Sequence, residues 1–107
     1  MTTWQSPTIY ILKFITSKCF GKNIDFHASV FRELENAIDT AIEIIREDIE
    51  VFEGENANDV FSKYYVDSNK LKQRIRNTRR DGDSYVDITI GSTAYSICIV
   101  KDEPCEG

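Results

Sequence analysis

The feature that most constrains this chain is a set of apolar residues that recur every three or four positions between Ser29 and Glu53. They are Val30, Phe31, Leu34, Ala37, Ile38, Ala41, Ile42, Ile45, Ile49 and Phe52. This spacing is typical of an amphipathic α-helix with one apolar stripe. It predicts a helix over residues 29–53, on the order of 36 Å long, with Ser29 as its N-cap and Gly54 at its end. Such a stripe needs a partner surface, because ordering the backbone is costly.

Segments rich in β-branched and aromatic residues supply that surface. Residues 8–16 predict a strand with apolar residues on both sides, as in the centre of a sheet. Residues 23–27 alternate, and they predict a short second strand with Ile24 and Phe26 facing inward.

Residues 84–100 predict a β-hairpin, because the two-residue turn Gly91-Ser92 joins two β-rich runs. A turn of that length fixes the register. The register puts the pairs Ile90–Thr93, Ile88–Tyr95 and Val86–Ile97 on one face. The other face receives Asp87–Ser96, Thr89–Ala94 and Tyr85–Cys98. One face is therefore apolar and the other mostly polar, so we expect the helix to cover only the apolar face.

Two short helices are expected between the long helix and the hairpin. Asn56 to Asp59 is a polar cluster that opens a helix over 59–66, and Asp67-Ser68 caps another over 69–80. Asp81-Gly82-Asp83 then breaks the chain.

These segments together predict an α+β fold. It has a three- to four-stranded antiparallel sheet, one long amphipathic helix packed on one face, a short helical pair, the C-terminal hairpin and a polar tail over 101–107. The 107 residues fit one domain, 1–107.

Composition excludes several classes of protein. The longest apolar run falls far short of the roughly 20 residues that cross a bilayer, and the N-terminus lacks the basic start of a secretory signal. Cys19, Cys98 and Cys105 are odd in number and irregularly spaced, unlike a disulfide framework. We therefore expect a cytoplasmic protein with no membrane partner. The net charge of −5 argues against general binding of nucleic acid or anionic lipid.

The acidic residues are concentrated on the predicted long helix. Ten acids and one base, Arg46, lie from Glu33 to Asp59. Four of the acids are spaced to line one solvent-facing ridge: Asp39, Glu43, Glu47 and Glu50. The ridge is either a solvated face or a docking surface for a basic partner, since carboxylates about one helical turn apart imitate a phosphate backbone. A metal site or acid–base pair is a third reading, without calcium-loop spacing to support it.

The basic residues are concentrated in a second segment. Six cations and no acid occupy eleven residues: Lys70, Lys72, Arg74, Arg76, Arg79 and Arg80. Three roles are open to them, namely neutralising the acidic helix within the fold, gripping nucleic-acid phosphates, or contacting an acidic protein surface.

Signatures of catalysis or cofactor binding are not found in the sequence. His27 is the single histidine, so a Ser-His-Asp triad has no further candidate, and Cys-His chemistry would have to use Cys19 or Cys98. Zinc-ligand spacing and phosphate-binding glycine loops are missing. We expect a non-enzymatic protein without metal or cofactor, and an enzyme with a minimal site around His27 is the third-ranked alternative.

Two resemblances bear on function. Residues 9–12, Ile-Tyr-Ile-Leu, with Gly21 to Ile24 resemble the opening of a GIY-YIG nuclease domain over about 20 residues, but the glycine before Ile-Tyr and the second-strand Tyr-Ile-Gly are missing, so we set it aside. In size and charge segregation the chain also resembles phage and mobile-element proteins that inhibit host defence or nucleic-acid machinery, anti-CRISPR proteins included. That resemblance implies a small acidic protein that binds and inhibits a macromolecule, most simply a protein with a basic surface. The alternative is a nucleic-acid-binding accessory or regulatory protein that uses residues 70–80.

Overall fold

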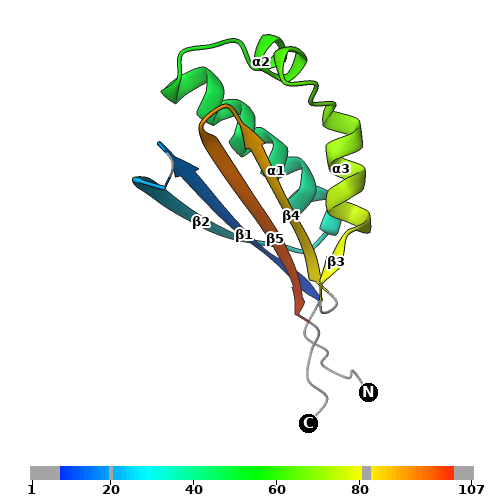
Figure 1. The fold of residues 1–107 in the computed structure, drawn as a ribbon. Helices are drawn as coiled ribbons and strands as arrows, with labels where there is room; N and C mark the ends of the chain where they lie inside the picture. The colour runs from blue at the N-terminus through cyan, green and yellow to red at the C-terminus, as the bar shows by residue number, and fades with distance from the viewer. Residues whose placement is uncertain (1–7, 20, 81–82, 103–107) are drawn as a thin grey trace, which may run out of the picture.

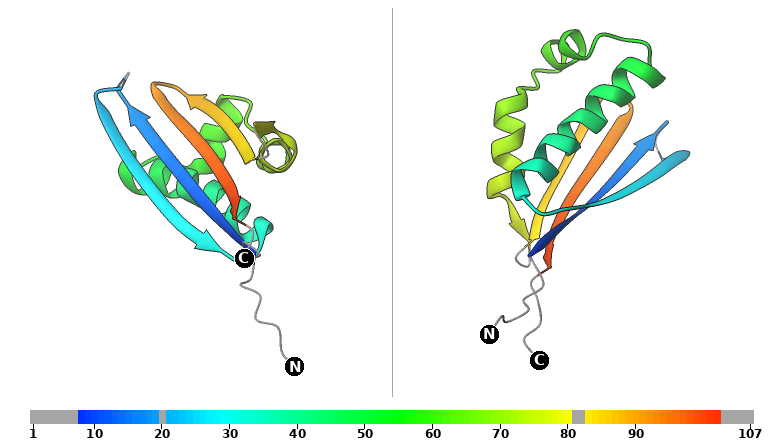
Figure 2. Two further views of the ribbon diagram at one scale, coloured as in Figure 1. Left: turned by 90° about the horizontal axis from the view of Figure 1, so that it is seen from below. Right: turned by 180° about the vertical axis from the view of Figure 1, so that it is seen from behind.

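The protein folds as a curved antiparallel sheet with its helices on one face (Figures 1 and 2). The computed structural model describes residues 8–19, 21–80 and 83–102, without the side chains of Arg79 and Arg80. Its elements are β1 (Ile9–Lys18), β2 (Asn23–Phe31), α1 (Leu34–Glu47), the π-helix η1 (Asp48–Phe52), α2 (Ala57–Lys63), α3 (Ser68–Asn77), β3 (Arg79–Arg80), β4 (Asp83–Ile90) and β5 (Thr93–Asp102). The strand order is β2-β1-β5-β4-β3, in which β3 has only two residues. The predicted α+β class and its antiparallel sheet are confirmed.

The sheet is built around β1 and the C-terminal hairpin. Strand β1 pairs with β2 on one side and β5 on the other, as expected for the central strand. The β4–β5 register matches the predicted one at all six pairs, and Gly91 in its turn has a positive φ of 64°. The hairpin extends a little beyond 84–100 and takes up the start of the expected tail at Lys101 and Asp102, while residues 103–107 lie outside the described residues.

The core lies between the helices and the covered face of the sheet. Helix α1 and η1 bury Ala37, Ile38, Ala41, Ile42, Ile45 and Ile49. The sheet meets them with Leu12, Phe14, Val86, Tyr95, Ile97 and Ile99. Phe14 and Tyr95 contact each other with ring centroids 5.9 Å apart. Helices α2 and α3 close one side of this core with Phe61, Leu71 and Ile75. Each of these large side chains contributes roughly 1.5–3 kcal/mol by leaving water.

The long helix begins five residues later than predicted. Ser29 is not its N-cap, because β2 continues to Phe31 and pairs there with Tyr10 of β1. The first helical residue is Leu34, preceded by Glu33 in extended conformation. Pairing with β1 satisfies the backbone of the last β2 residues, so this long-range contact overrides the helical period of the local sequence.

The prediction that Ile24 and Phe26 face inward is wrong. The pairing of β1 with β2 begins at Lys18–Asn23, and with that register His27 lies opposite the buried Phe14. His27 therefore shares the helix-facing side, because directly paired residues lie on the same face. Ile24 and Phe26 fall on the uncovered face, where they are 65% and 63% exposed.

The helical stripe also changes direction near its end. At Asp48 the α-helix becomes the π-helix η1, whose turn is wider than that of an α-helix. Each residue of the wider turn adds less rotation, so the residues that follow fall out of line with the apolar stripe. Phe52 lies outward, at 72% exposure, so its predicted burial is wrong. Gly54 follows with φ of 66°, the left-handed conformation expected at the helix end.

The two short helices are shifted from their predicted bounds. Helix α2 starts earlier than the predicted 59–66, because the Asn56 side chain accepts a hydrogen bond from the Asp59 amide and acts as the N-cap. Asp67 caps α3 as expected, through hydrogen bonds from the amides of Asn69 and Lys70. Helix α3 ends before residue 80, because β3 pairs with the start of β4. Among the described residues, none of the helices has the length and apolar character to cross a membrane.

The wider turn at η1 predicts unequal effects of truncating two stripe residues. Ile45 is fully buried, so Ile45→Ala should lower the free energy of unfolding by about 2–5 kcal/mol. Phe52→Ala should cost less than about 1 kcal/mol, since its ring is exposed and mainly loses the cation–π contact with Lys18. Urea denaturation followed by circular dichroism measures both values. Equal losses would contradict the outward position of Phe52.

Candidate functional site

The far end of α1–η1 is attached to the sheet through a buried carboxylate. Asp48 is 8% exposed, and its Oδ2 accepts a 2.7 Å hydrogen bond from the Tyr95 hydroxyl of β5. Its Oδ1 lies 2.7 Å from Nζ of Lys18 at the end of β1. Lys18 also pairs with Glu53 at 3.0 Å. Asp48 is thus satisfied within the fold and has a structural role.

This network changes the pKa values of its two donors in the same direction. Burial, reinforced by the hydrogen bond to Asp48, raises the pKa of the Tyr95 phenol far above its ordinary value. For Lys18, burial acts to lower the pKa, but the hydrogen bonds and negative charges of Asp48 and Glu53 outweigh it and raise the pKa. Both groups therefore keep their protons more firmly in the folded protein than in the unfolded chain.

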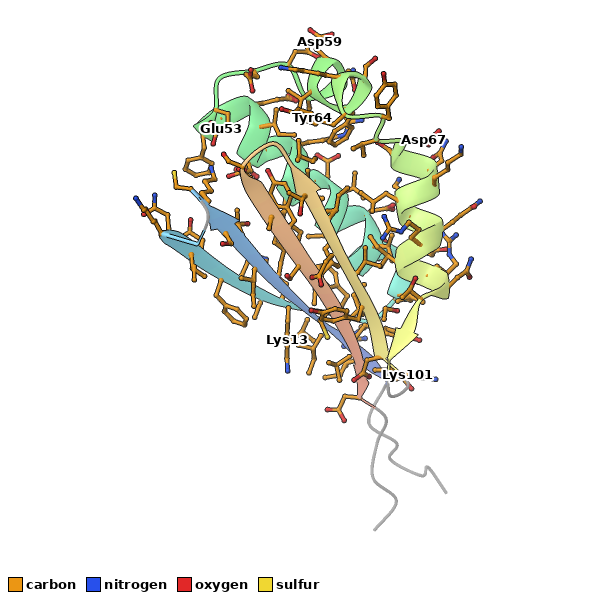
Figure 3. All side chains as sticks on the ribbon, in the orientation of Figure 1. Lys13, Glu53, Asp59, Tyr64, Asp67 and Lys101 are labelled. Atoms are coloured by element: carbon orange, nitrogen blue, oxygen red, sulfur yellow. The ribbon has the colours of Figure 1, made fainter. Side chains whose placement is uncertain are left out.

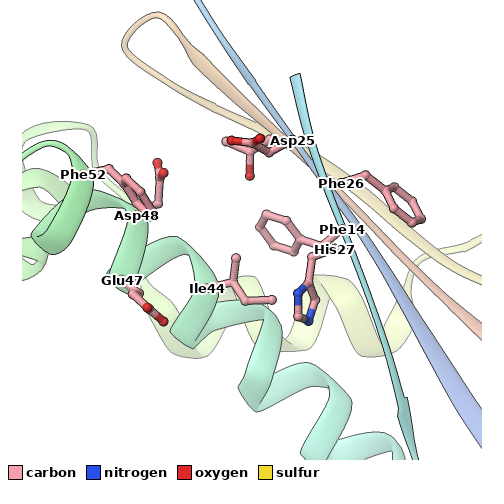
Figure 4. Close-up of a pocket in the computed structure, with 9 residues that line it drawn as sticks. Phe14, Asp25, Phe26, His27, Ile44, Glu47, Asp48 and Phe52 are labelled. Atoms are coloured by element: carbon pink, nitrogen blue, oxygen red, sulfur yellow. The ribbon is translucent and has the colours of Figure 1, made fainter. Parts of the chain in front are cut away.

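An open cleft lies beside this network, between α1–η1 and the β1–β2 pair (Figure 4). It has a volume of about 590 Å³ and is lined by Phe14, Thr16, Asp25, Phe26, His27, Ile44, Glu47, Asp48 and Phe52. His27 and Ile44 approach from opposite walls, whereas the Phe26 ring points to the other side of β2. The floor is apolar and the rim carries carboxylates.

The exposed polar side chains that line the cleft are Asp25, His27 and Glu47. His27 Nε2 lies 2.6 Å from Ser29 Oγ, so one hydrogen bond joins them. Asp25 and Glu47 form no ion pair with any residue that the structure describes. Within the same residues, the structure brings no three His, Cys, Asp or Glu side chains close enough to hold a metal ion. The cleft is instead suited to a cationic group on an apolar stem, since such a stem covers apolar surface while its charge meets carboxylates.

The predicted acidic ridge is divided by the fold. Asp39 pairs with Lys72 of α3 at 3.0 Å, and nearby Glu35 holds Arg76 with a closest approach of 2.7 Å. The other three ridge residues, Glu43, Glu47 and Glu50, are exposed and make no ion pair within the described part of the chain. Because the Asp39–Lys72 pair is itself partly exposed, it contributes at most about 1 kcal/mol.

The basic segment is divided in the same way. Lys72 and Arg76 face α1 and neutralise part of its charge. Lys70 and Arg74 instead line a second pocket, on the side where α3 meets β4. Arg79 and Arg80 belong to β3.

Of the two cysteines that could act with His27 in Cys-His chemistry, Cys98 lies too far from it to do so. Cys98 lies opposite Lys13, which alternates with Phe14 along β1, so Cys98 and His27 are on opposite faces of the sheet. Burial, followed by the charge of Asp83, raises the pKa of the Cys98 thiol against the opposing effect of Lys13. Cys98 is therefore a poor nucleophile. Cys19 is exposed and free, and Cys105 lies outside the described residues.

Sequence reasoning missed the cleft because it ended the second strand too early. A signal was present: Asp25, His27 and Ser29 alternate with Ile24, Phe26 and Val30, and this period of two continues beyond residue 27.

No protein-family model matches the chain, and comparisons with curated proteins and with solved structures give no match. Function is therefore inferred from the geometry of the molecule alone.

The pKa directions predict a loss of stability at alkaline pH. Above about pH 10, a tyrosine in the unfolded chain releases its proton while Tyr95 in the fold keeps it, so the free energy of unfolding falls as pH rises. The fall from Tyr95 is at most about 1.4 kcal/mol per pH unit, and the raised pKa of Lys18 acts in the same direction. Tyr95→Phe should lower stability at pH 7 by roughly 1.5–3 kcal/mol and should make the alkaline decline shallower.

Urea denaturation at a series of pH values from neutral to alkaline measures both effects. Tyr65→Phe is the matched control, because it removes a hydroxyl from a side chain that is 96% exposed. An unchanged alkaline slope in Tyr95→Phe would argue that the phenol ionises freely in the fold.

Proposed function

We propose that the protein is a non-enzymatic binding protein whose partner is a protein with a basic surface. The observation that carries the proposal is the exposure of Glu43, Glu47 and Glu50 beside the cleft. Glu35, Asp39 and Asp48 have cationic partners within the fold, whereas these three have none among the described residues. A basic surface would supply the missing charges.

The local energetics favour an external cation. Glu43 and Glu47 are one turn apart, and such like-charged pairs destabilise a helix by roughly 0.2–0.5 kcal/mol each. Arg46 does not relieve them, because its guanidinium bonds Asn58 at 3.0 Å and lies over the Phe61 ring at 5.1 Å. A lysine or arginine from a partner would be attracted to the ridge without displacing any contact of Glu43 or Glu47.

The cleft adds specificity to this attraction. A partner arginine or lysine could cover the half-buried Ile44 with its aliphatic stem while its charge meets Asp25 or Glu47. The exposed Phe52 and Val51 continue the surface at the end of η1. The fitting ligand is therefore a segment that alternates basic and apolar side chains.

The proposal extends to inhibition. Carboxylates spaced about one helical turn apart present negative charge at intervals comparable to phosphates. A partner whose basic groove normally holds nucleic acid would be blocked by α1, which is the action of inhibitors carried by phages and mobile elements. This extension is supported only by the charge pattern of α1.

The first test replaces the three exposed carboxylates. Glu43→Lys, Glu47→Lys and Glu50→Lys combined should weaken binding of a fluorescent arginine- and leucine-containing peptide at least about tenfold, or roughly 1.4 kcal/mol, because attraction becomes repulsion. Fluorescence anisotropy measures the affinity. NMR shift changes in the wild type should cluster on Ile44, Glu47 and Phe52.

The matched control is the combination Glu55→Lys, Asp87→Lys and Asp102→Lys, which carries the same net charge on other exposed positions. It should bind the peptide as the wild type does. The same three proteins can capture partners from the native host, with identification by mass spectrometry. Equal loss in both variants, or peptide-induced shifts away from the cleft, would refute the proposed surface.

A further inference from the structure

A second surface of different character lies where α2 and α3 meet β4, and we call it the Tyr65 surface. Tyr64, Tyr65, Asp67, Lys70 and Arg74 line an open pocket there of about 360 Å³, and Lys63 lies beside the Tyr64 ring. Figure 3 shows the turn from Tyr64 to Asp67 at one end of α3, with nitrogen-tipped side chains projecting from α3 into solvent. The acidic face and the cleft of the proposed function are not part of it.

The cations of this surface are available to a ligand. Lys70 and Arg74 are one turn apart on the side of α3 away from α1, and Lys63 Nζ lies 5.6 Å from the centroid of the Tyr64 ring. None of the three forms an ion pair with a described residue. The carboxylate of Asp67 also lines the pocket, where its Oδ1 accepts hydrogen bonds from two amides at the start of α3. Three cations therefore stand against one carboxylate on this surface.

The Tyr65 ring has no role in packing. Tyr65 is 96% exposed, and its backbone is in the left-handed region with φ of 57°. Hydrogen bonds from Tyr65 N to Ser62 O at 3.2 Å and from Val66 N to Phe61 O at 2.7 Å hold this turn. A bulky residue at positive φ is uncommon, and strained residues of this kind cluster at functional sites. The turn presents the ring to solvent beside the cations.

We infer that the Tyr65 surface binds single-stranded nucleic acid. Lys63, Lys70 and Arg74 contact backbone phosphates, and the Tyr65 ring stacks on an unpaired base. An exposed aromatic ring among cations is the usual arrangement in proteins that hold single strands, because every base offers a face for stacking. In a duplex the base faces are stacked on one another and cannot reach the ring. An acidic protein surface could pair with the cations but offers no base for the ring to stack on.

The test uses fluorescent oligothymidylate and oligouridylate, a DNA duplex of equal length, and polyglutamate, each titrated with the intact protein at low salt. We expect binding of the single strands, weaker binding of the duplex, and a log–log salt slope near −2, about 0.7 for each of three phosphate contacts. Tyr65→Ala should weaken binding about tenfold by loss of stacking, and Tyr65→Phe should restore it. Lys70→Ala with Arg74→Ala should reduce the slope by about 1.4.

The control is Lys13→Ala with Lys22→Ala, which removes two exposed lysines from β1 and from the β1–β2 turn. It should keep the wild-type affinity and slope. The melting temperature of each variant establishes that it is folded. If Tyr65→Ala does not fold, the Lys70 and Arg74 variant still tests the inference. Absence of single-strand binding, equal loss in the control, or equal affinity for duplex or polyglutamate would overturn the inference.

Discussion

The end of α1–η1 is fixed to the sheet by the contact of one buried carboxylate with two strands. Asp48 receives the Tyr95 hydroxyl from β5 and the Lys18 ammonium from β1. Removing it would leave the buried Tyr95 hydroxyl without its acceptor and Lys18 with Glu53 alone, and an unsatisfied buried donor costs more than the net gain of the bond itself. The same residue begins η1, the wider turn that ends at the exposed Phe52, and it lines the cleft beside β1 and β2. Structure and candidate site thus share one determinant.

Features set by local pattern could be predicted, and features set by distant pairing could not. The hairpin register followed from the turn Gly91-Ser92, and the helical stripe from its period. The predicted start of the helix was wrong because pairing with β1 extends β2 to Phe31. The local sequence does not indicate this long-range contact. Of the candidate site, the exposed glutamates could be named from their spacing. Asp48 could not be separated from the other acids, since nothing in its neighbours indicates the approach of Tyr95.

The charges fall into those that the fold uses and those that it leaves exposed. Contacts between α1 and α3 take up Glu35 and Asp39 with Arg76 and Lys72. These pairs are partly exposed and screened by water, so they orient the two helices more than they stabilise them. The unused charges lie on opposite flanks of this contact, acids on the outer face of α1 and bases on the far side of α3. Charge segregation along the sequence becomes segregation between two surfaces.

Asp39 lies at the boundary between these surfaces. Its pairing with Lys72 sets the free energy that a basic partner loses when it contacts Asp39. A basic partner that reaches Asp39 must displace Lys72, whose side chain is 34% exposed against 58% for Asp39. Water already screens that pair, so the exchange loses little energy. The displaced ammonium would remain on α3, whose far side carries Lys70 and Arg74, and would add to the positive charge there. Occupation of the acidic face therefore need not oppose binding at the Tyr65 surface, because the two use different residues of a helix pair held mainly by its apolar core.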